Sequence, residues 1–367
     1  MTIKKIEIFH IAIPFLQSFE TSFGVISERP AVIVKMTNNK GLFGFGECST
    51  LYVPMSEQEV VRDSMRVLAQ LSKVIIDTEI RGVEELKQIC DSVAGYPVTK
   101  LALEGAYFDI LAQEHNQPLY QLFGATQNKV NIGESIGIKN DIAEVVEEVQ
   151  NRVNQGCKRV KLKIKPGYDY EIVKAVREKF PNLLLGVDAN SGYTNESLDD
   201  LVKLNEFNLL FIEQPFNGKD LELHAKLQKQ ISAPICLDES IVSLESCTQA
   251  VELGACKMVN IKPARIGSFV ESKLIHDYCL AKGIPMFGGG RFETGIGKVA
   301  NAHFFALPGF TEPADLTPPL EYFERDVIDP SLIVENGVFE LSENVGIGVK
   351  VLEDTIRSYQ KEVLVFE

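Results

Sequence analysis

The sequence predicts an α/β protein: a (β/α) barrel of modified TIM-barrel type, with an N-terminal α+β capping domain that the C-terminal tail completes. Three observations support this prediction. Antiparallel strand patterns and helical patterns fill the first third of the chain, a regular strand–helix rhythm follows them, and charged residues end successive strands of that rhythm at a nearly constant interval. The length of 367 residues also favours two domains over one core.

The capping domain is expected over residues 1–125. Apolar patterns predict antiparallel strands and then helices; the strands are expected at residues 3–14, 30–36 and 42–47, and the helices at 57–74, 83–93 and 99–114. Two loops at 19–24 and 49–54 interrupt the strands. Loops with aromatic and hydroxyl side chains often bind ligands, so Phe19, Ser22 and Tyr52 are candidate substrate contacts.

The barrel is expected over residues 126–320, as strands that alternate with helices such as the one predicted at 142–155. The predicted strands are 131–138, 159–164, 183–187, 209–212, 235–237, 258–261, 284–288 and a last one near Asp315. From residue 321 to 367 the rhythm stops. A turn at Asn336-Gly337 lies in this tail, which we expect to fold back against the capping domain.

Composition excludes several classes of function. The net charge of −14 argues against a nucleic-acid partner, and no apolar run approaches the length of a membrane span. The seven cysteines are scattered and odd in number, as expected for free thiols in a reducing compartment. We therefore expect a cytoplasmic protein that acts on a small molecule, and barrels of this type commonly form homo-oligomers.

The charged residues of the repeat lie at the ends of five successive strands. Lys163, Asp188, Glu213, Asp238 and Lys262 are spaced 25, 25, 25 and 24 residues apart. A unit of that length accommodates one strand, one helix and two loops. Because the carboxyl ends of barrel strands meet at one mouth, we expect these five side chains to lie together there.

The three carboxylates of this set predict a metal site. Alternation along a strand turns Lys161 and Lys163 to the same inner face, next to Asp188, Glu213 and Asp238. Three carboxylates without a neighbouring histidine suit a hard cation, so Mg²⁺ is the expected cofactor and Mn²⁺ a substitute. Asn190 shares the face of Asp188.

The two outer lysines predict acid–base chemistry. Lys163 and Lys262 come from the second and sixth strands, so we expect them to face each other across a bound substrate. A metal ion and a second ammonium nearby should lower a lysine pKa toward neutrality. Such a lysine can remove a proton α to a carboxylate. A Schiff-base lysine aldolase without a metal is an alternative, which borohydride trapping would reveal, and a barrel kept only for binding would need a lost catalytic group.

Weaker signals surround this set. Gly289 and Gly290 follow the seventh strand, where they form either a flexible turn or a place for close approach of substrate. Arg265 lies one turn beyond Lys262, where it is a candidate to steer the protonation of that lysine or to bind an anion. Ser135 on the first barrel strand is a candidate hydrogen-bond donor to a ligand.

The motifs resemble those of the enolase superfamily, in its muconate-lactonizing-enzyme subgroup. Nine stretches carry the resemblance: Thr21-Ser-Phe-Gly24, Gly44-Phe-Gly-Glu47, Ser135-Ile-Gly-Ile138, Lys161-Leu-Lys-Ile-Lys-Pro-Gly167, Asp188-Ala-Asn-Ser-Gly-Tyr193, Ile212-Glu-Gln-Pro-Phe216, Ile235-Cys-Leu-Asp-Glu-Ser240, Asn260-Ile-Lys-Pro-Ala-Arg265 and Glu293-Thr-Gly-Ile-Gly297. Within the subgroup they are most similar to those of o-succinylbenzoate synthases, which act in menaquinone biosynthesis, and N-succinylamino acid racemases. The resemblance implies a lyase, an isomerase, or both.

The resemblance also implies roles for single residues. Lys163 and Lys262 would be the acid–base pair, and Asp188, Glu213 and Asp238 the Mg²⁺ ligands. A supporting set would be Lys161, Asn190, Glu239 and Arg265. One departure concerns substrate choice: where these families usually have Gly-Gly-Met-Leu-Glu, this chain has Gly289-Gly-Arg-Phe-Glu293, which makes Arg291 a candidate partner for a second carboxylate.

Related chemistries can be weighed by the same residues. A mandelate-racemase type would need a histidine on the seventh strand, and residues 288–291 contain none. Dipeptide epimerases typically carry Asp-x-Asp at the eighth strand, whereas Asp315-Leu-Thr317 has one aspartate. Muconate cycloisomerases share both lysines, so they stay open as an alternative.

Overall fold

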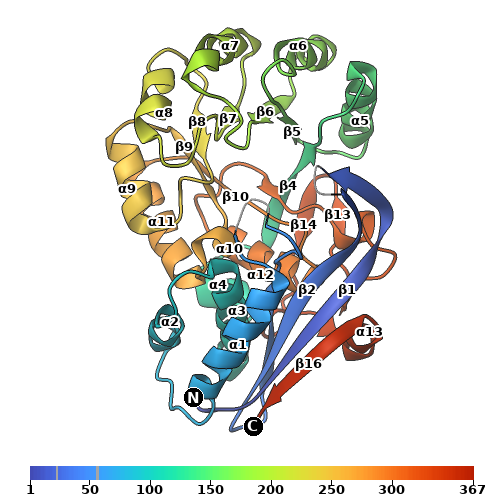
Figure 1. The fold of residues 1–367 in the computed structure, drawn as a ribbon, viewed down its shortest axis with the longest axis vertical. Coiled ribbons are helices and arrows are strands. Elements are labelled where there is room, and N and C mark those ends of the chain that lie inside the picture. The colour runs from blue at the N-terminus through green and yellow to red at the C-terminus, as the bar shows by residue number, and fades with distance from the viewer. Residues whose placement is uncertain (22–23, 55–57) are drawn as a thin grey trace.

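The computed structural model describes residues 1–21, 24–54 and 58–367, with the side chains of residues 18–26 outside the description. It has two parts, a capping domain that contains both termini and a barrel above it (Figure 1). The described residues confirm the predicted fold class: a mixed α/β chain in which a parallel barrel follows an antiparallel sheet. The domain boundaries near 125 and 320 stay predictions.

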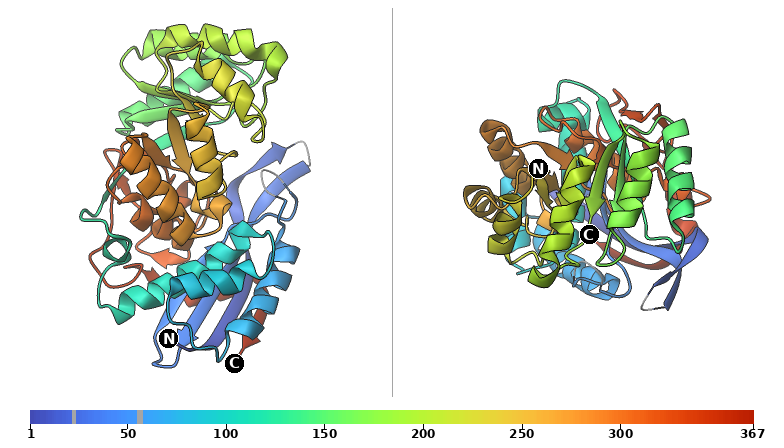
Figure 2. Two further views of the ribbon diagram at one scale, coloured as in Figure 1. Left: turned by 90° about the vertical axis from the view of Figure 1, so that its left-hand side faces the viewer. Right: turned by 90° about the horizontal axis from the view of Figure 1, so that it is seen from above.

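The sheet of the capping domain is antiparallel, in the order β16-β1-β2-β3. Its strands are β1 (Ile3–Thr21), β2 (Gly24–Asn38), β3 (Phe43–Cys48) and β16 (Gln360–Phe366). The first two are longer than predicted and extend past the sheet toward the barrel (Figure 2). Residues 19–21, predicted as a loop, belong to β1, because pairing with β2 resumes after a register shift between Pro14 and Phe19.

Helices α1 (Val61–Ile75), α2 (Val83–Asp91), α3 (Pro97–Glu114) and α4 (Leu119–Phe123) complete this domain. Helix α1 begins later than predicted because Val60 is extended and bridges Leu51. Helix α3 lies directly on β3. A side chain at Gly46 would place its Cβ 1.9 Å from the carbonyl oxygen of Ala102, so the close contact of this strand and helix requires glycine.

Eight parallel strands form the barrel in the described chain. Seven pairs of neighbouring strands are hydrogen-bonded to each other, and the barrel closes where Met286 of the seventh strand forms a single bridge with Phe310, just before the eighth. The strands are β4 (Lys129–Ile136), β5 (Arg159–Lys163), β6 (Leu184–Asp188), β7 (Phe211–Glu213), β8 (Ile235–Leu237), β9 (Met258–Ile261), β10 (Met286–Gly288) and β11 (Ala314–Asp315). The helices between them cover the outside of the barrel (Figure 2). These are α5 (Ile142–Asn154), α6 (Tyr170–Lys179), α7 (Leu198–Lys203), α8 (Leu221–Gln228), α9 (Leu244–Glu252), α10 (Pro263–Ile266), α11 (Phe269–Lys282) and α12 (Gly295–Phe305), with 3₁₀ turns at Asn195–Ser197, Leu204–Phe207 and Pro319–Glu321.

The inside of the barrel changes character along its axis. Phe211, Cys236, Met258 and Phe287 form a separate apolar cluster with at most 2% of each residue exposed. Two residues further along β7 and β8, the inner face carries charge instead, because side chains alternate along a strand. The apolar layer therefore closes the barrel beneath a charged layer at its mouth.

The C-terminal tail packs on the capping domain, as predicted, and in addition on the first strand of the barrel. Its elements are β12 (Ile328–Asp329), β13 (Val334–Glu335), β14 (Val338–Glu340), β15 (Lys350–Val351), α13 (Glu353–Ser358) and β16. The turn at Asn336-Gly337 makes a hairpin of β13 and β14, and β14 pairs with the start of β4, while β16 pairs with β1. In the described parts of the chain, no helix is long and apolar enough to span a bilayer.

Candidate active site

The strand register brings the predicted residues together at the mouth of the barrel. Lys163 lies opposite Asp188, and Asp188 lies opposite Glu213, across adjacent parallel strands. Asp238 follows β8 directly, and Lys262 follows β9. The three carboxylates are buried, with 0–2% of each residue exposed. Their shared orientation follows from the pleat, which turns every second residue of a strand inward.

Lysine side chains from β5 bind two of these carboxylates. Lys161 donates to Glu213 Oε2 at 2.7 Å and lies 3.4 Å from Asp188 Oδ2. Lys163 donates to Asp188 Oδ2 at 2.6 Å and to Asn190 Oδ1 at 2.5 Å. The side chain of Lys161 is almost fully buried, whereas that of Lys163 is 32% exposed. Lys163 can therefore reach a substrate at the mouth, and Lys161 stays beneath it.

A second group of contacts surrounds Asp238. Lys262 donates to Asp238 Oδ2 at 2.7 Å, and Arg265 donates through Nε and Nη2 to both oxygens at 3.1 Å. Arg265 thus binds the same carboxylate as Lys262. Glu239 lies beside them, where it accepts a hydrogen bond from Asn190 Nδ2 at 3.2 Å.

The pKa values of Asp188 and Glu213 are shifted in opposite directions by their surroundings. Burial, aided by the charge of Asp188 and opposed by Lys161, raises the pKa of Glu213 to about 7. Burial would also raise the pKa of Asp188, but Lys163 and Lys161 outweigh it and hold this pKa below its ordinary value. The negative charges of the buried carboxylates are thus only partly neutralised by the lysines, and additional positive charge near Glu213 would favour its ionised form.

The pKa of Lys262 depends on its burial and on the carboxylates around it. Burial alone would lower the pKa of Lys262, but Asp238, Glu239 and Glu213 together outweigh burial and Arg265, so this pKa is raised. In the same way, burial acts against ionisation of Asp238, while Arg265 and Lys262 hold its pKa far below the ordinary range. The direct ion pair, at 2.7 Å, is the physical reason for both directions.

The donor set fits a hard divalent cation in its chemistry. Asp188, Glu213 and Asp238 offer six carboxylate oxygens from adjacent strands, and oxygen is the ligand that Mg²⁺ prefers. In the described ranges, no three acidic, histidine or cysteine side chains stand close enough together to form a finished metal cage. Lysine ammonium groups contact one oxygen of each carboxylate instead. When bound, a divalent cation would be held by the carboxylates of Asp188, Glu213 and Asp238.

Three residues at this site were not predicted as site residues. Asp315 Oδ2 accepts from Lys161 at 2.6 Å, and Asn260 donates to Glu213 at 2.8 Å. Gln214, whose backbone is left-handed, accepts a hydrogen bond at Oε1 from the backbone N–H of Asp238. This bond connects the turn after β7 to the end of β8. Only Asp315 and Asn260 had a signal in the sequence, since each occupies an inward position at a strand end.

The glycines after β10 lie against the chain itself. A Cβ at Gly289 would lie 2.8 Å from Lys262 Cε and 2.2 Å from Asn260 Oδ1, and one at Gly290 would lie 1.9 Å from the carbonyl oxygen of Asp315. Any side chain at these positions would displace Lys262 or the eighth strand. Close approach rather than flexibility therefore requires glycine here, and the approaching group is the catalytic candidate Lys262.

Arg291 and Phe292, which stand where the related families usually have Met and Leu, lie in a loop that contacts the capping domain. The backbone N–H of Arg291 donates to Glu293, and its carbonyl oxygen accepts from Lys298. The ring of Phe292 packs edge-on against Phe15 of β1, with centroids 6.4 Å apart, and against Tyr322 of the tail. Phe292 therefore fastens this loop to two other segments.

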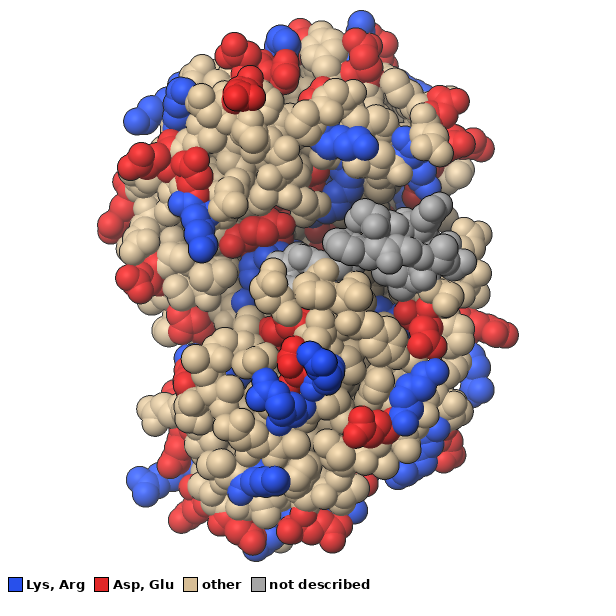
Figure 3. Space-filling model, viewed as in Figure 1, with Lys and Arg blue, Asp and Glu red and all other residues tan. Residues whose placement is uncertain are grey.

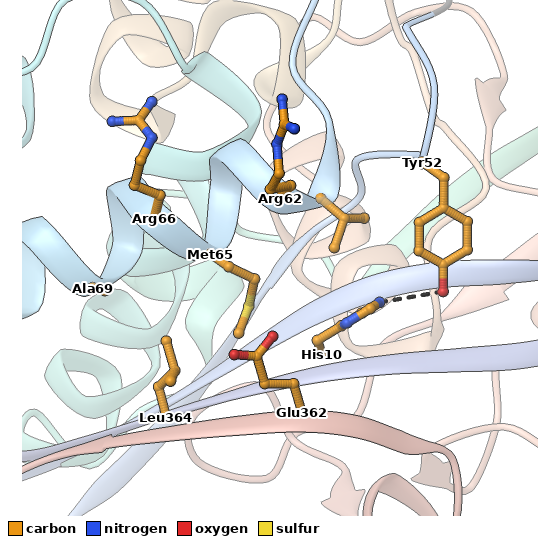
Figure 4. Close-up of a pocket in the computed structure, with 9 residues that line it drawn as sticks. His10, Tyr52, Arg62, Met65, Arg66, Ala69, Glu362 and Leu364 are labelled. Carbon is orange, nitrogen blue, oxygen red and sulfur yellow. Dashed lines mark hydrogen bonds between the residues drawn. The ribbon is translucent and has the colours of Figure 1, made fainter.

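The remaining candidates lie at different places. Ser135 pairs with Lys161 across β4 and β5 and is exposed at the mouth. Tyr52 lies instead in a groove of the capping domain, where its hydroxyl is 3.3 Å from His10 Nε2 and donates to Glu28 (Figure 4). The predicted role of Ser22 lies outside the described residues, and that of Phe19 falls on a side chain outside the description.

A cleft lies between the two domains. It has a volume of about 910 Å³, with Tyr96 and Pro97 on the side of the capping domain and Glu239 and Arg265 on the side of the barrel. Acidic and basic side chains are visible in the hollow where the domains meet (Figure 3). Because Arg265 of this cleft binds Asp238, the cleft reaches the edge of the charged layer of the barrel.

Known proteins share this arrangement. The family described as mandelate racemase / muconate lactonizing enzyme, N-terminal domain, matches residues 5–124, and the family described as enolase C-terminal domain-like matches residues 144–355. An N-succinylamino acid racemase of Thermus thermophilus is 38% identical over 350 residues, with 95% of each chain covered. An o-succinylbenzoate synthase of Enterococcus faecalis is 36% identical over 362 residues, with 98% of this chain and 99% of that one covered.

A solved structure supports the same relationship. A member of the enolase superfamily from Listeria innocua superposes with a TM-score of 0.96 at 33% identity, and the match covers 100% of this chain and 99% of that one. The matched families span both domains, and the relatives are enzymes. The chain therefore belongs to the enolase superfamily and is one of its enzymes.

Proposed function

We propose that this enzyme removes the proton α to a carboxylate, acting as an o-succinylbenzoate synthase, as an N-succinylamino acid racemase, or as both. One observation carries the proposal: Lys163 at the end of β5 and Lys262 directly after β9 flank the row of carboxylates at the ends of the three strands between them. Relatives with these names, at 36% and 38% identity over nearly the whole chain, support the two substrate classes.

The cofactor that we propose is Mg²⁺, with Mn²⁺ as a substitute, held by Asp188, Glu213 and Asp238. Sites of this superfamily combine a lysine or histidine base with magnesium. When bound, the cation would supply positive charge that offsets the negative charge developing on the substrate carboxylate. The raised pKa of Glu213 supports the proposal, because it marks a place where buried anions favour added positive charge.

The two lysines divide the proton transfers. In racemisation, the neutral amine of one lysine takes the α-proton, the C–H electrons pass toward the carboxylate, and the ammonium of the other lysine returns a proton to the opposite face. In dehydration, one lysine takes the proton and can return it to the leaving hydroxyl, which departs as water. The second ammonium then stabilises the developing negative charge.

No specific observation favours a second function. Asp315, the one aspartate at the position where dipeptide epimerases carry two, contacts Lys161 and Arg159. The hydroxyl of Thr317 donates to Glu134. A muconate cycloisomerase would use the same lysines, so an assay panel must include muconate together with the o-succinylbenzoate precursor and N-succinyl amino acids.

Proton exchange in D₂O tests the assignment of the lysines directly. We expect Lys163→Ala and Lys262→Ala each to abolish racemisation, because racemisation needs a base on both faces. Each variant should still exchange the α-proton of one enantiomer of an N-succinyl amino acid, and the two variants should favour opposite enantiomers, as ¹H NMR would show. Exchange of the same enantiomer by both variants would mean that the lysines do not lie on opposite faces.

A further inference from the structure

Arg29 of β2 is among the largest fully buried side chains of the protein, with 1% of the residue exposed. In the hydrogen bonds that the structure describes, its guanidinium donates to backbone carbonyl oxygens. These acceptors come from three segments of the chain: Pro30 next to it, Ser49 and Thr50 after β3, and Phe292 after β10. One side chain thus joins the capping domain to a loop of the barrel mouth.

The geometry of these bonds requires arginine. Nε donates to the carbonyl oxygen of Phe292 at 2.8 Å, Nη1 donates to those of Pro30 and Thr50, and Nη2 donates to that of Ser49. A lysine has a single nitrogen and cannot reach three segments in different directions. Burial, aided by the nearby charge of Arg291, lowers the pKa of Arg29 only to about 10, so it stays charged at neutral pH.

Of the two loops that Arg29 joins, one packs on Lys262, and the other begins near Ala264, which follows Lys262 closely in the chain. The loop after β10, residues 289–293, rests on the side chain of Lys262 through Gly289. The loop after β3, residues 49–54, begins at Ser49, which lines a small cavity between the domains together with Ala264 and Glu293. A shift of the loop after β10 would therefore displace the backbone that packs on Lys262, and Arg29 couples that loop to the one after β3.

We propose that Arg29 is a positioning residue, which holds these two loops in register with each other and thereby determines which acyl groups the site accepts. The proposal rests on the proposed function above. In this proposal, Lys163 and Lys262 hold the α-carbon end of the substrate at the strand ends, and the acyl group extends toward the capping domain. There it meets the wall that the two loops form.

Hydrogen exchange provides a test that needs no substrate. In Arg29→Lys, peptides that cover residues 49–54 and 289–293 should both exchange faster, by about tenfold or more, since both lose a shared donor. Arg177→Lys is the matched control. Arg177 likewise donates to backbone carbonyl oxygens, those of Phe180, Pro181, Leu183, Phe207 and Asn208, which precede β6 and β7 at the opposite end of the barrel. That variant should affect only peptides around 180–183 and 207–208.

Substrate discrimination provides the second readout. We expect Arg29→Lys to change the ratio of kcat/KM for the N-succinyl and N-acetyl forms of one amino acid by about fivefold or more. The ratio does not depend on the folded fraction, so mere loss of stability leaves it unchanged. Arg177→Lys should keep it within about twofold.

The outcomes separate this proposal from the proposed function. Faster exchange in only one of the two loops, or an unchanged ratio, overturns the positioning role of Arg29. If Arg29→Lys does not fold, Arg29→Gln, which keeps a planar end with two N–H donors, is measured in the same way against the same control. If the wild-type enzyme acts on neither N-acyl form, the proposed racemase activity fails, and the exchange experiment still decides whether Arg29 ties the loops.

Discussion

The buried carboxylates at the barrel mouth and those at the contact between the domains are compensated in different ways. At the barrel mouth, Asp188 and Asp238 are paired with lysine ammonium groups. At the contact between the domains, Glu47 of β3 accepts from the backbone N–H groups of Thr294 and Gly297, at the N-terminus of α12. Glu104 of α3 does the same for α11, through Ser268 and the backbone N–H groups of Phe269 and Val270.

The difference separates carboxylates whose partners can be replaced by a ligand from carboxylates whose partners belong to the backbone of a helix. The N–H groups at a helix N-terminus cannot leave without unwinding the helix, so Glu47 and Glu104 act as caps that fasten the capping domain to the barrel. A lysine side chain, by contrast, can rotate about its own bonds without unwinding a helix, so a cation or a substrate that replaces its positive charge can take its place beside the carboxylate. Functional carboxylates are therefore expected where the partner is a mobile side chain.

The largest expected effect is the loss of activity on removal of divalent cations. EDTA should reduce turnover by at least roughly 1,000-fold, because a bound metal contributes several kcal/mol of transition-state stabilisation. Mg²⁺ or Mn²⁺ added back should restore it. Circular dichroism should show an unchanged fold, since the caps at Glu47 and Glu104 need no metal. Full turnover in chelated buffer would contradict the assignment of the mouth as a metal site.

Asp238→Asn should have the next largest effect. It removes a proposed metal ligand and leaves Lys262 and Arg265 without their shared anion. We expect a loss of kcat/KM of at least about 100-fold, or roughly 3 kcal/mol, as for removal of one strong electrostatic contact. Asp109→Asn is the matched control, since Asp109 is also buried but accepts from the backbone N–H groups of Phe45 and Ile347. Equal losses in both variants would remove the distinction between the regions.

A smaller effect is expected at the contact between the domains. Glu104→Ala leaves two backbone N–H groups and a hydroxyl at the start of α11 without their acceptor, which should cost about 1–3 kcal/mol of the free energy of unfolding. Activity per folded molecule should stay within about twofold. Glu178→Ala, at an exposed position of α6, serves as the control in the same denaturant titration. A loss of kcat without a loss of stability would show that Glu104 serves catalysis rather than the contact between the domains.

The smallest expected effect is a dependence of stability on pH. Burial raises the pKa of Glu104 to about 7, above its ordinary value near 4.5. Between these values the folded protein binds a proton that the unfolded chain has released, so stability falls as pH rises through this window. Relative to Glu104→Gln, the wild type should lose about 1 kcal/mol of its free energy of unfolding between pH 5 and pH 6. A parallel pH profile for both proteins would show that Glu104 is ionised throughout.

The residues at the strand ends could be predicted from the sequence because two local rules determine them. Strands that repeat every 25 residues place their carboxyl ends at one mouth, and alternation turns Lys161, Lys163 and Asp188 inward.

The path of the C-terminal tail could be predicted only in part. Its last strand pairs with β1 as expected, but the hairpin around Asn336-Gly337 pairs with β4, a choice that depends on which free edge the hairpin meets.

The sequence by itself determined the fold class, the row of carboxylates and the two flanking lysines, because these depend on spacing and alternation along neighbouring strands. Tertiary structure alone decided the rest. Arg29 meets Phe292 across 263 residues of chain, Lys161 meets Asp315 across 154, and Gly289 rests on Lys262. No periodicity links such pairs, because only the closure of the barrel and the docking of the capping domain bring them together.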